Sequence, residues 1–105
     1  MSGKIEVLTS KDFNNFISKG VVVVDFYAEW CGPCKIMAPA FEKAAHKLNN
    51  VKFAKLDVDK NHEIAQHYGV MSIPTTIVFK NGEAVDMRSG ALSESEITKM
   101  AEKGK

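Results

Sequence analysis

The chain has 105 residues, of which 45% are hydrophobic and 26% are charged, and its formal net charge is +1. These values are typical of one globular domain spanning residues 1–105, and the balanced charge argues against binding to nucleic acid or to an anionic membrane. The longest aliphatic run, Val21 to Val24, is too short for a membrane span or a signal peptide, so we expect a cytoplasmic protein. The balanced charge gives no reason to expect a partner chain, so we also expect a monomer.

Strand and helix patterns alternate along the first half of the chain. A nearly continuous apolar run that includes four valines predicts a strand covered on both faces. Before it, Thr9 or Ser10 can cap a helix, with Asp12 placed for a capping-box contact. Pro39 falls inside a later helix and removes one hydrogen bond, which predicts a kink there. In chain order we expect a strand at 5–8, a helix from the cap to Lys19, a strand at 21–28, a helix from about 33 to 48 and a strand at 51–58.

The second half of the chain ends in a hairpin and a helix. Asn81-Gly82 between two strand patterns is a strong signal for a two-residue hairpin turn. Ser93 and Glu96 have the spacing of a capping box for the last helix. We expect a helix at 61–68 closed by Gly69, a strand at 75–79, a returning strand at 84–88 and a helix that begins after Ser93.

This order of elements predicts an α/β fold. Alternating strands and helices favour parallel pairing through right-handed crossovers, and the C-terminal hairpin adds an antiparallel edge. We therefore expect a central mixed sheet with helices on both faces. Functional sites in such sheets gather beyond the carboxyl ends of the strands, which is where the segment after the strand at 21–28 lies.

The segment Trp30-Cys31-Gly32-Pro33-Cys34 holds the only two cysteines and the only tryptophan. Two thiols three positions apart at a helix start have Cα atoms roughly 5–6 Å apart, which suits a disulfide. A helix start also gathers free N–H groups and the positive end of the helix dipole, and both favour a thiolate. The segment therefore predicts a redox-active pair that needs no bound cofactor. The alternative, two buried and inert thiols, is disfavoured by the Gly-Pro turn between them.

The chain resembles the thioredoxin family over essentially its whole length. The resemblance implies the thioredoxin fold and a protein-disulfide reductase that passes electrons from a thioredoxin reductase to disulfides of substrate proteins and so maintains thiol redox balance. Gly32 and Pro33 would tune the redox potential of the pair toward reduction. Tyr27 departs from the pattern, since many members have a second Trp there. The motifs that carry the resemblance are 25–35, Pro39, 55–59, 68–70, 72–75, 79–82 and Gly90-Ala91.

The two cysteines are expected to have different roles. Cys31 lies on the N-terminal side of the turn, where its sulfur can face solvent, so we expect it to attack the substrate disulfide. Cys34, one turn into the helix and less exposed, would then resolve the mixed disulfide and release reduced substrate.

Asp25 is the candidate proton acceptor for Cys34. It is either a charge that points to water at a strand end or a buried carboxylate with a raised pKa. We favour burial, because Val23 and Tyr27 share its face of the strand. The thioredoxin pattern also places an acid at this position, with a lysine nearby that Lys55 matches. We expect Lys55 to be a supporting charge that helps to tune the redox pair.

The resemblance also implies a docking surface for substrate. The Ile73-Pro74 bond would be cis and pack against the disulfide, and the backbone of Ile73 would pair with an extended substrate segment. Trp30 could instead pack in the core, but its neighbours in the turn favour exposure. The expected docking residues are Trp30, Gly32, Pro33, Ile73, Pro74, Gly90 and Ala91.

Three other functions are weighed against the reductase. A thiol oxidase or isomerase on the same fold is disfavoured by the Gly-Pro dipeptide and by the lack of a signal-peptide pattern. A binding module whose partner docks regardless of redox state would keep its activity in a Cys31→Ser variant. A metal site would need two of His46, His62 and His67 to meet both cysteines, and these histidines lack metal-ligand spacing.

Overall fold

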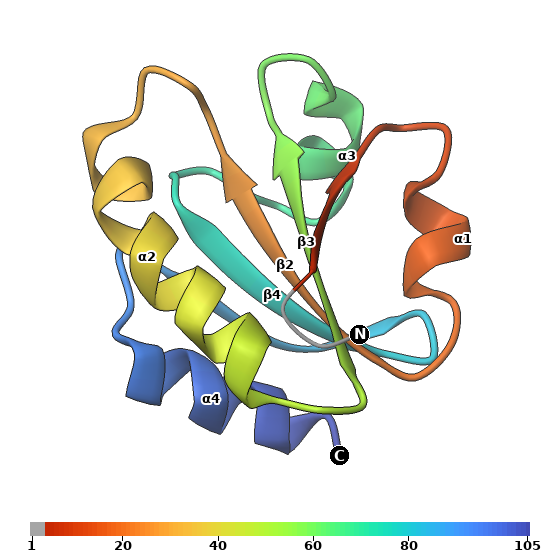
Figure 1. Cartoon of the computed structure of the whole chain (residues 1–105). Coiled ribbons are helices and arrows are strands. Elements are labelled where there is room, and N and C mark those ends of the chain that lie inside the picture. Colours follow the sequence, from red (N-terminus) through yellow and green to blue (C-terminus); the bar gives the residue numbers. More distant parts are fainter. Residues whose placement is uncertain (1–3) are drawn as a thin grey trace.

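A mixed five-stranded sheet with the strand order β1-β3-β2-β4-β5 forms the centre of the molecule (Figure 1). The structure, a computed structural model, describes residues 4–105. The elements in chain order are β1 Ile5–Leu8, α1 Phe13–Ile17, β2 Val21–Tyr27, α2 Gly32–Lys47, β3 Val51–Asp57, α3 His62–His67, β4 Thr75–Lys80, β5 Glu83–Ser89 and α4 Glu94–Lys103.

The pairing of the strands confirms the predicted mixed sheet. Strand β3 pairs in parallel with β1 and β2, whereas β4 pairs antiparallel with both β2 and β5. Strand β2 is therefore central, and its residues from Val21 to Phe26 are all buried. This burial explains why the strand is nearly continuous apolar sequence, since no face of it meets solvent.

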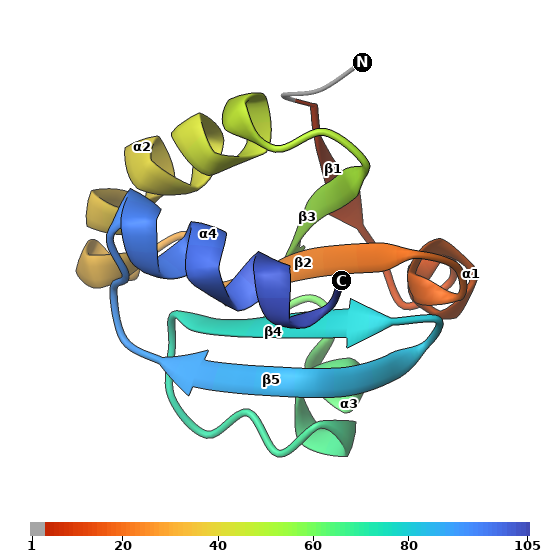
Figure 2. The same ribbon diagram turned by 90° about the horizontal axis from the view of Figure 1, so that it is seen from below.

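Helices cover both faces of the sheet, as predicted (Figures 1 and 2). Alternate residues of β2 point to opposite faces, so Val23 packs beneath α2 and α4 while Val24 packs on the side of α1 and α3. On the first face, the rings of Phe41 and Phe53 meet edge-on with centroids 5.3 Å apart. On the second face, Phe13 contacts three aromatic rings, those of Phe26, Tyr68 and Phe79.

The first helix is shorter than predicted, because it begins after Asp12 and ends at Ile17 instead of Lys19. The expected contact does form, since the Asp12 carboxylate accepts the backbone N–H of Thr9 at 2.7 Å. The Thr9 carbonyl, however, accepts the N–H groups of both Asp12 and Phe13, which makes a turn before the helix. At the other end the chain leaves the helix after Ile17, where the Ser18 N–H bonds three residues back to Asn15.

Two other local signals, the hairpin turn and the capping box, are confirmed. Asn81 and Gly82 have φ angles of 50° and 89°, the left-handed geometry that a two-residue hairpin turn requires. Ser93 and Glu96 form both hydrogen bonds of the capping box at the start of α4. Helix α2 continues through Pro39 as one element, and the kink there stays a prediction.

Gly104, just after α4, is where the C-terminal segment lies closest to the sheet. A Cβ atom on this residue would lie 2.8 Å from Cγ1 of Val21 and 3.0 Å from Cγ1 of Val78. Its φ of −79° is open to any residue, so the lack of space and not the backbone conformation calls for glycine. None of the helices within residues 4–105 combines the length and the apolar character needed to cross a membrane.

Candidate active site

The cysteine pair lies where β2 gives way to α2, at the carboxyl end of the central strand. Cys31 is the N-cap residue of α2, and the helix begins at Gly32 with Pro33 as its second residue. Cys31 and Cys34 form a disulfide with their Cα atoms 5.3 Å apart, within the predicted range. Proline has no backbone N–H to donate. Pro33 is tolerated here because the N–H groups of the first helical turn have no partner inside the helix.

The sulfur of Cys31 accepts a hydrogen bond from the first turn of the helix. The donor is the backbone N–H of Cys34, 3.2 Å away. Because the N-terminus of this 16-residue helix also carries the positive end of the helix dipole, negative charge on this sulfur is stabilised. The geometry therefore favours a thiolate at Cys31 once the disulfide is reduced.

The expected difference in exposure between the two cysteines is wrong for the oxidised pair. Cys31 is 2% exposed and Cys34 is 5% exposed, because each sulfur covers the other and Tyr27, Val58 and Ile73 pack against them. What separates the two residues is the space that each one borders. Cys31 lines an outer groove, and Cys34 lines an inner cavity together with Asp25.

The outer groove has a volume of about 590 Å³. Trp30 is 70% exposed at its edge, so the core-packing alternative for this residue is wrong. The indole Nε1–H donates a hydrogen bond of 2.8 Å to Oδ2 of Asp59, which fixes the ring beside the groove. The groove is lined by Trp30, Cys31, Gly32, Pro33, Val58, Val70, Met71, Ser72 and Ile73.

The predicted docking residues are only partly gathered in this groove. The Ile73-Pro74 peptide bond is cis, as expected, and Ile73 packs against the cluster that contains both cysteines. Pro74 is buried, and its carbonyl oxygen accepts the N–H of Gly90 at 2.8 Å. Gly90 and Ala91 are exposed and do not line the groove.

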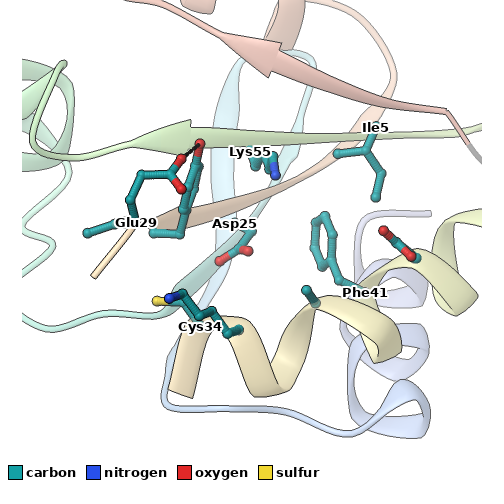
Figure 3. A pocket seen from close by; sticks show the side chains of 11 residues that line it. Ile5, Asp25, Glu29, Cys34, Phe41 and Lys55 are labelled. Carbon is teal, nitrogen blue, oxygen red and sulfur yellow. Dashed lines mark hydrogen bonds between the residues drawn. The ribbon is translucent and has the colours of Figure 1, made fainter. Parts of the chain in front are cut away.

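The inner cavity lies behind the disulfide and has a volume of about 140 Å³. Asp25 points into it from β2, with Cys34 on one side and Lys55 on the other (Figure 3). Asp25 is 5% exposed, so the buried alternative is confirmed. Burial raises the pKa of Asp25 to about 7, although the positive charge of Lys55 lowers it in part. This carboxyl is therefore poised to exchange a proton near neutral pH.

Lys55 acts on Asp25 from a distance. The two residues are register partners on β3 and β2, yet no ion pair joins them in the part of the chain that the structure describes. The Lys55 ammonium lies instead over the ring of Tyr27, 4.9 Å from its centroid. The Tyr27 hydroxyl donates to Glu29 at 3.4 Å, which holds the ring in place at the cavity edge. Tyr27 thus supplies a ring that supports the lysine.

The three histidines lie apart from this site. His46, His62 and His67 are exposed on α2 and α3. Within residues 4–105, no three side chains of His, Cys, Asp or Glu are arranged to hold a metal ion.

Asp59 and Met71 are among the site residues to which sequence reasoning gave no role. Asp59 binds the indole of Trp30, and Met71 borders the groove. The position of Asp59 could have been noticed, because it follows the carboxyl end of β3, which is the neighbour of β2 in the sheet. Met71 has no such signal, since it reaches the groove only through the loop before the cis peptide bond.

The chain is similar to known proteins in both sequence and fold. Residues 4–103 match the family model described as Thioredoxin. The chain is 48% identical over 83 residues to thioredoxin of Bacillus subtilis, covering 78% of this chain and 80% of that protein. The solved thioredoxin of Fasciola hepatica superposes with a TM-score of 0.88 at 42% identity, covering 96% of this chain and all of that one. A structure on thiol resolution in yeast mitochondrial 1-Cys peroxiredoxin through the glutathione and thioredoxin systems has a TM-score of 0.86 at 33% identity, covering 97% and 99% of the two chains.

Proposed function

Because this chain belongs to the thioredoxin family and is a protein-disulfide reductase that works through its Cys31–Cys34 pair, we propose a separate role for each residue of the site. Cys31 is the attacking thiolate, and Cys34 resolves the mixed disulfide. Asp25 accepts the proton of Cys34. The observation that carries this assignment is the N–H of Cys34 donated to the sulfur of Cys31, together with the cavity that Cys34 shares with Asp25.

In the first step the Cys31 thiolate attacks one sulfur of a substrate disulfide. A bond forms between that sulfur and Cys31, the substrate disulfide breaks, and the other substrate sulfur leaves as a thiolate that takes a proton from water. The first turn of α2 favours the ionised form of Cys31, so that a nucleophile is present at neutral pH.

In the second step Cys34 attacks the sulfur of Cys31. Its thiol proton passes to the carboxylate of Asp25, which a pKa near neutrality makes a suitable acceptor. The Cys31–Cys34 disulfide forms, the bond from Cys31 to substrate breaks, and the second substrate sulfur leaves. Two electrons have then moved from the dithiol to the substrate, and the pair itself is the only electron carrier.

The groove beside Trp30 receives an extended segment of the substrate. Ile73 offers its backbone next to the disulfide, and the indole of Trp30 forms an apolar wall held by Asp59. Gly32 and Pro33 shape the turn and tune the potential of the pair. Pro74 fixes the cis bond beside the groove and accepts the N–H of Gly90, while Gly90 and Ala91 offer exposed backbone outside the groove lining.

The partners follow from this chemistry. Substrates are proteins with accessible disulfides, and a peroxiredoxin is one such class, suggested by the yeast structure. A thioredoxin reductase restores the dithiol. A reducing pair works in a compartment that keeps thiols reduced, which supports action in the cytoplasm.

The test is the reduction of insulin by dithiothreitol, followed by turbidity, with wild type beside Cys31→Ser and Cys34→Ser. Wild type should accelerate precipitation strongly and both variants should not. Cys34→Ser should in addition accumulate mixed disulfides, which a non-reducing gel detects. Full activity in Cys31→Ser would overturn the reductase mechanism and favour a redox-independent binding module.

A further inference from the structure

Two buried polar atoms beside the active site have no hydrogen-bond partner within residues 4–105. They are Oδ1 of Asp25 and Oγ1 of Thr76. Asp25 is 5% exposed and Thr76 is 0% exposed, so bulk water satisfies neither. Buried polar groups are almost always hydrogen-bonded, and two orphans in one region call for a common explanation.

The sheet places these two residues side by side. Asp25 on β2 is the direct register partner of Thr76 on the antiparallel strand β4. Both side chains point to the face under α2 and α4, because their neighbours Val23 and Val78 are partners in the core cluster of that face. Directly opposed residues have Cβ atoms about 4.5–5.5 Å apart, which is within reach of a hydroxyl and a carboxyl after a side-chain rotation.

We propose that Thr76 is a positioning residue for Asp25, whose carboxyl its hydroxyl reaches across the β2–β4 pair after a side-chain rotation. The hydroxyl donates to the carboxylate before the proton of Cys34 arrives and accepts from the carboxylic acid afterwards, because a hydroxyl is both donor and acceptor. This inference rests on the proposed role of Asp25 as proton acceptor. It adds a hydroxyl on β4 to the site that β2, β3 and α2 form.

A purely structural role for Thr76 accounts for less of what is observed. Valine has the same shape, suits a strand as well as threonine does, and leaves no unpaired hydroxyl in the core. The hydroxyl of the adjacent Thr75, by contrast, is fully explained, since it donates to the carbonyl of Ser72 at 2.6 Å on the other face of β4. Of these two hydroxyls on β4, that of Thr76 is the one without a structural partner.

The electrostatic surroundings of Asp25 remain the same when Thr76 changes, so the hydroxyl can be tested by itself. The ionisable groups that border the cavity besides Asp25 are Tyr27 at the end of β2, Glu29 just after β2, Lys55 on β3, and Lys35 and Glu42 on α2. Beyond Thr76 lies its register partner Arg88 on β5, which pairs with Glu96 of α4 at 3.3 Å.

The experiment is an NMR titration of the Asp25 carboxyl carbon in the oxidised chain of 105 residues. Wild type is compared with Thr76→Val, Thr76→Ala and Thr76→Ser, and Thr75→Val serves as the control on the opposite face. A hydrogen bond to the ionised carboxylate lowers its pKa, so loss of the hydroxyl in Thr76→Val should raise the pKa of Asp25 by about one pH unit. Thr76→Ser should restore the wild-type value, and Thr75→Val should leave it unchanged.

An unchanged titration in Thr76→Val would overturn the inference, and so would a raised value that Thr76→Ser fails to restore. Thr76→Ala gives the same comparison if the valine variant does not fold. The insulin assay on wild type tests the reductase separately. If the pKa of Asp25 does not change in the Thr76 variants, the Thr76 proposal fails but the reductase function stands. If the wild type does not reduce insulin, the reductase function fails whatever the titration shows.

Discussion

The buried carboxyl of Asp25 should make the stability of the oxidised protein depend on pH in a way that Asp25→Asn removes. The pKa of Asp25 rises from an ordinary 3.8 to about 7 in the folded chain. Between these values the folded protein holds a proton that the unfolded chain has lost. Unfolding therefore releases a proton in this range, and the free energy of unfolding falls as pH rises from about 4 through about 7.

The magnitude follows from the two pKa values. Their difference is about three pH units at 1.36 kcal/mol each, so the ionised, buried carboxyl costs about 4 kcal/mol above pH 8. The cost is about 1.5 kcal/mol at pH 5 and about 0.5 kcal/mol at pH 4. Asparagine does not titrate, so the stability of Asp25→Asn relative to wild type should increase by about 4 kcal/mol between pH 4 and pH 8.5.

The assay is urea denaturation of both oxidised proteins at five pH values from 4 to 8.5, without reductant. Comparing the two proteins at each pH cancels the titration of every group that they share. Ser95→Ala, which removes no ionisable group, is the control and should differ from wild type by a constant amount. A stability difference between Asp25→Asn and wild type that stays constant from pH 4 to pH 8.5 would refute the reasoning.

Three further predictions concern stability and docking. Ser93→Ala removes the capping box of α4 and should lower the unfolding free energy by about 1 kcal/mol in urea, with Ser95→Ala unchanged as the matched control. Gly104→Ala adds a methyl group against valines of β2 and β4 and should cost about 1–3 kcal/mol in the same measurement; an unchanged midpoint would mean that the C-terminal segment moves aside. Asp59→Ala removes the acceptor of the Trp30 indole and should raise the KM for insulin by about 2–10-fold with kcat kept, and a loss of kcat alone would contradict a docking role.

Most of the fold could be predicted because its signals are local. The run of four valines predicts the central strand, and the Asn81-Gly82 dipeptide predicts the hairpin turn. The capping-box spacing of Ser93 and Glu96 predicts where the last helix begins. The start of α1 could not be placed, since Thr9 and Asp12 form a hydrogen-bonded turn that competes with the helix for the same N–H groups.

The main residues of the site could be predicted from the sequence, but not the contacts that they make with distant segments. The cysteine motif and Asp25 could be read from the sequence, because both lie on one continuous segment. The burial of Cys31 could not, since it depends on Ile73, which packs against the pair from a distant loop. The neighbour of Asp25 on β4 could not be known either, because the register between β2 and β4 joins segments about fifty positions apart.

The short separation between the cysteines has a consequence for the working cycle. The bridge joins residues three positions apart, so it closes a loop of only four residues. In the chain-entropy description, closing such a loop lowers the conformational entropy of the unfolded chain and so stabilises the folded protein by about 2 kcal/mol. Longer loops give a larger stabilisation. A domain of this kind has a total stability of about 5–15 kcal/mol, so the dithiol form should stay folded as well. The cysteine pair can then be oxidised by substrate and reduced again many times without the protein unfolding between turnovers.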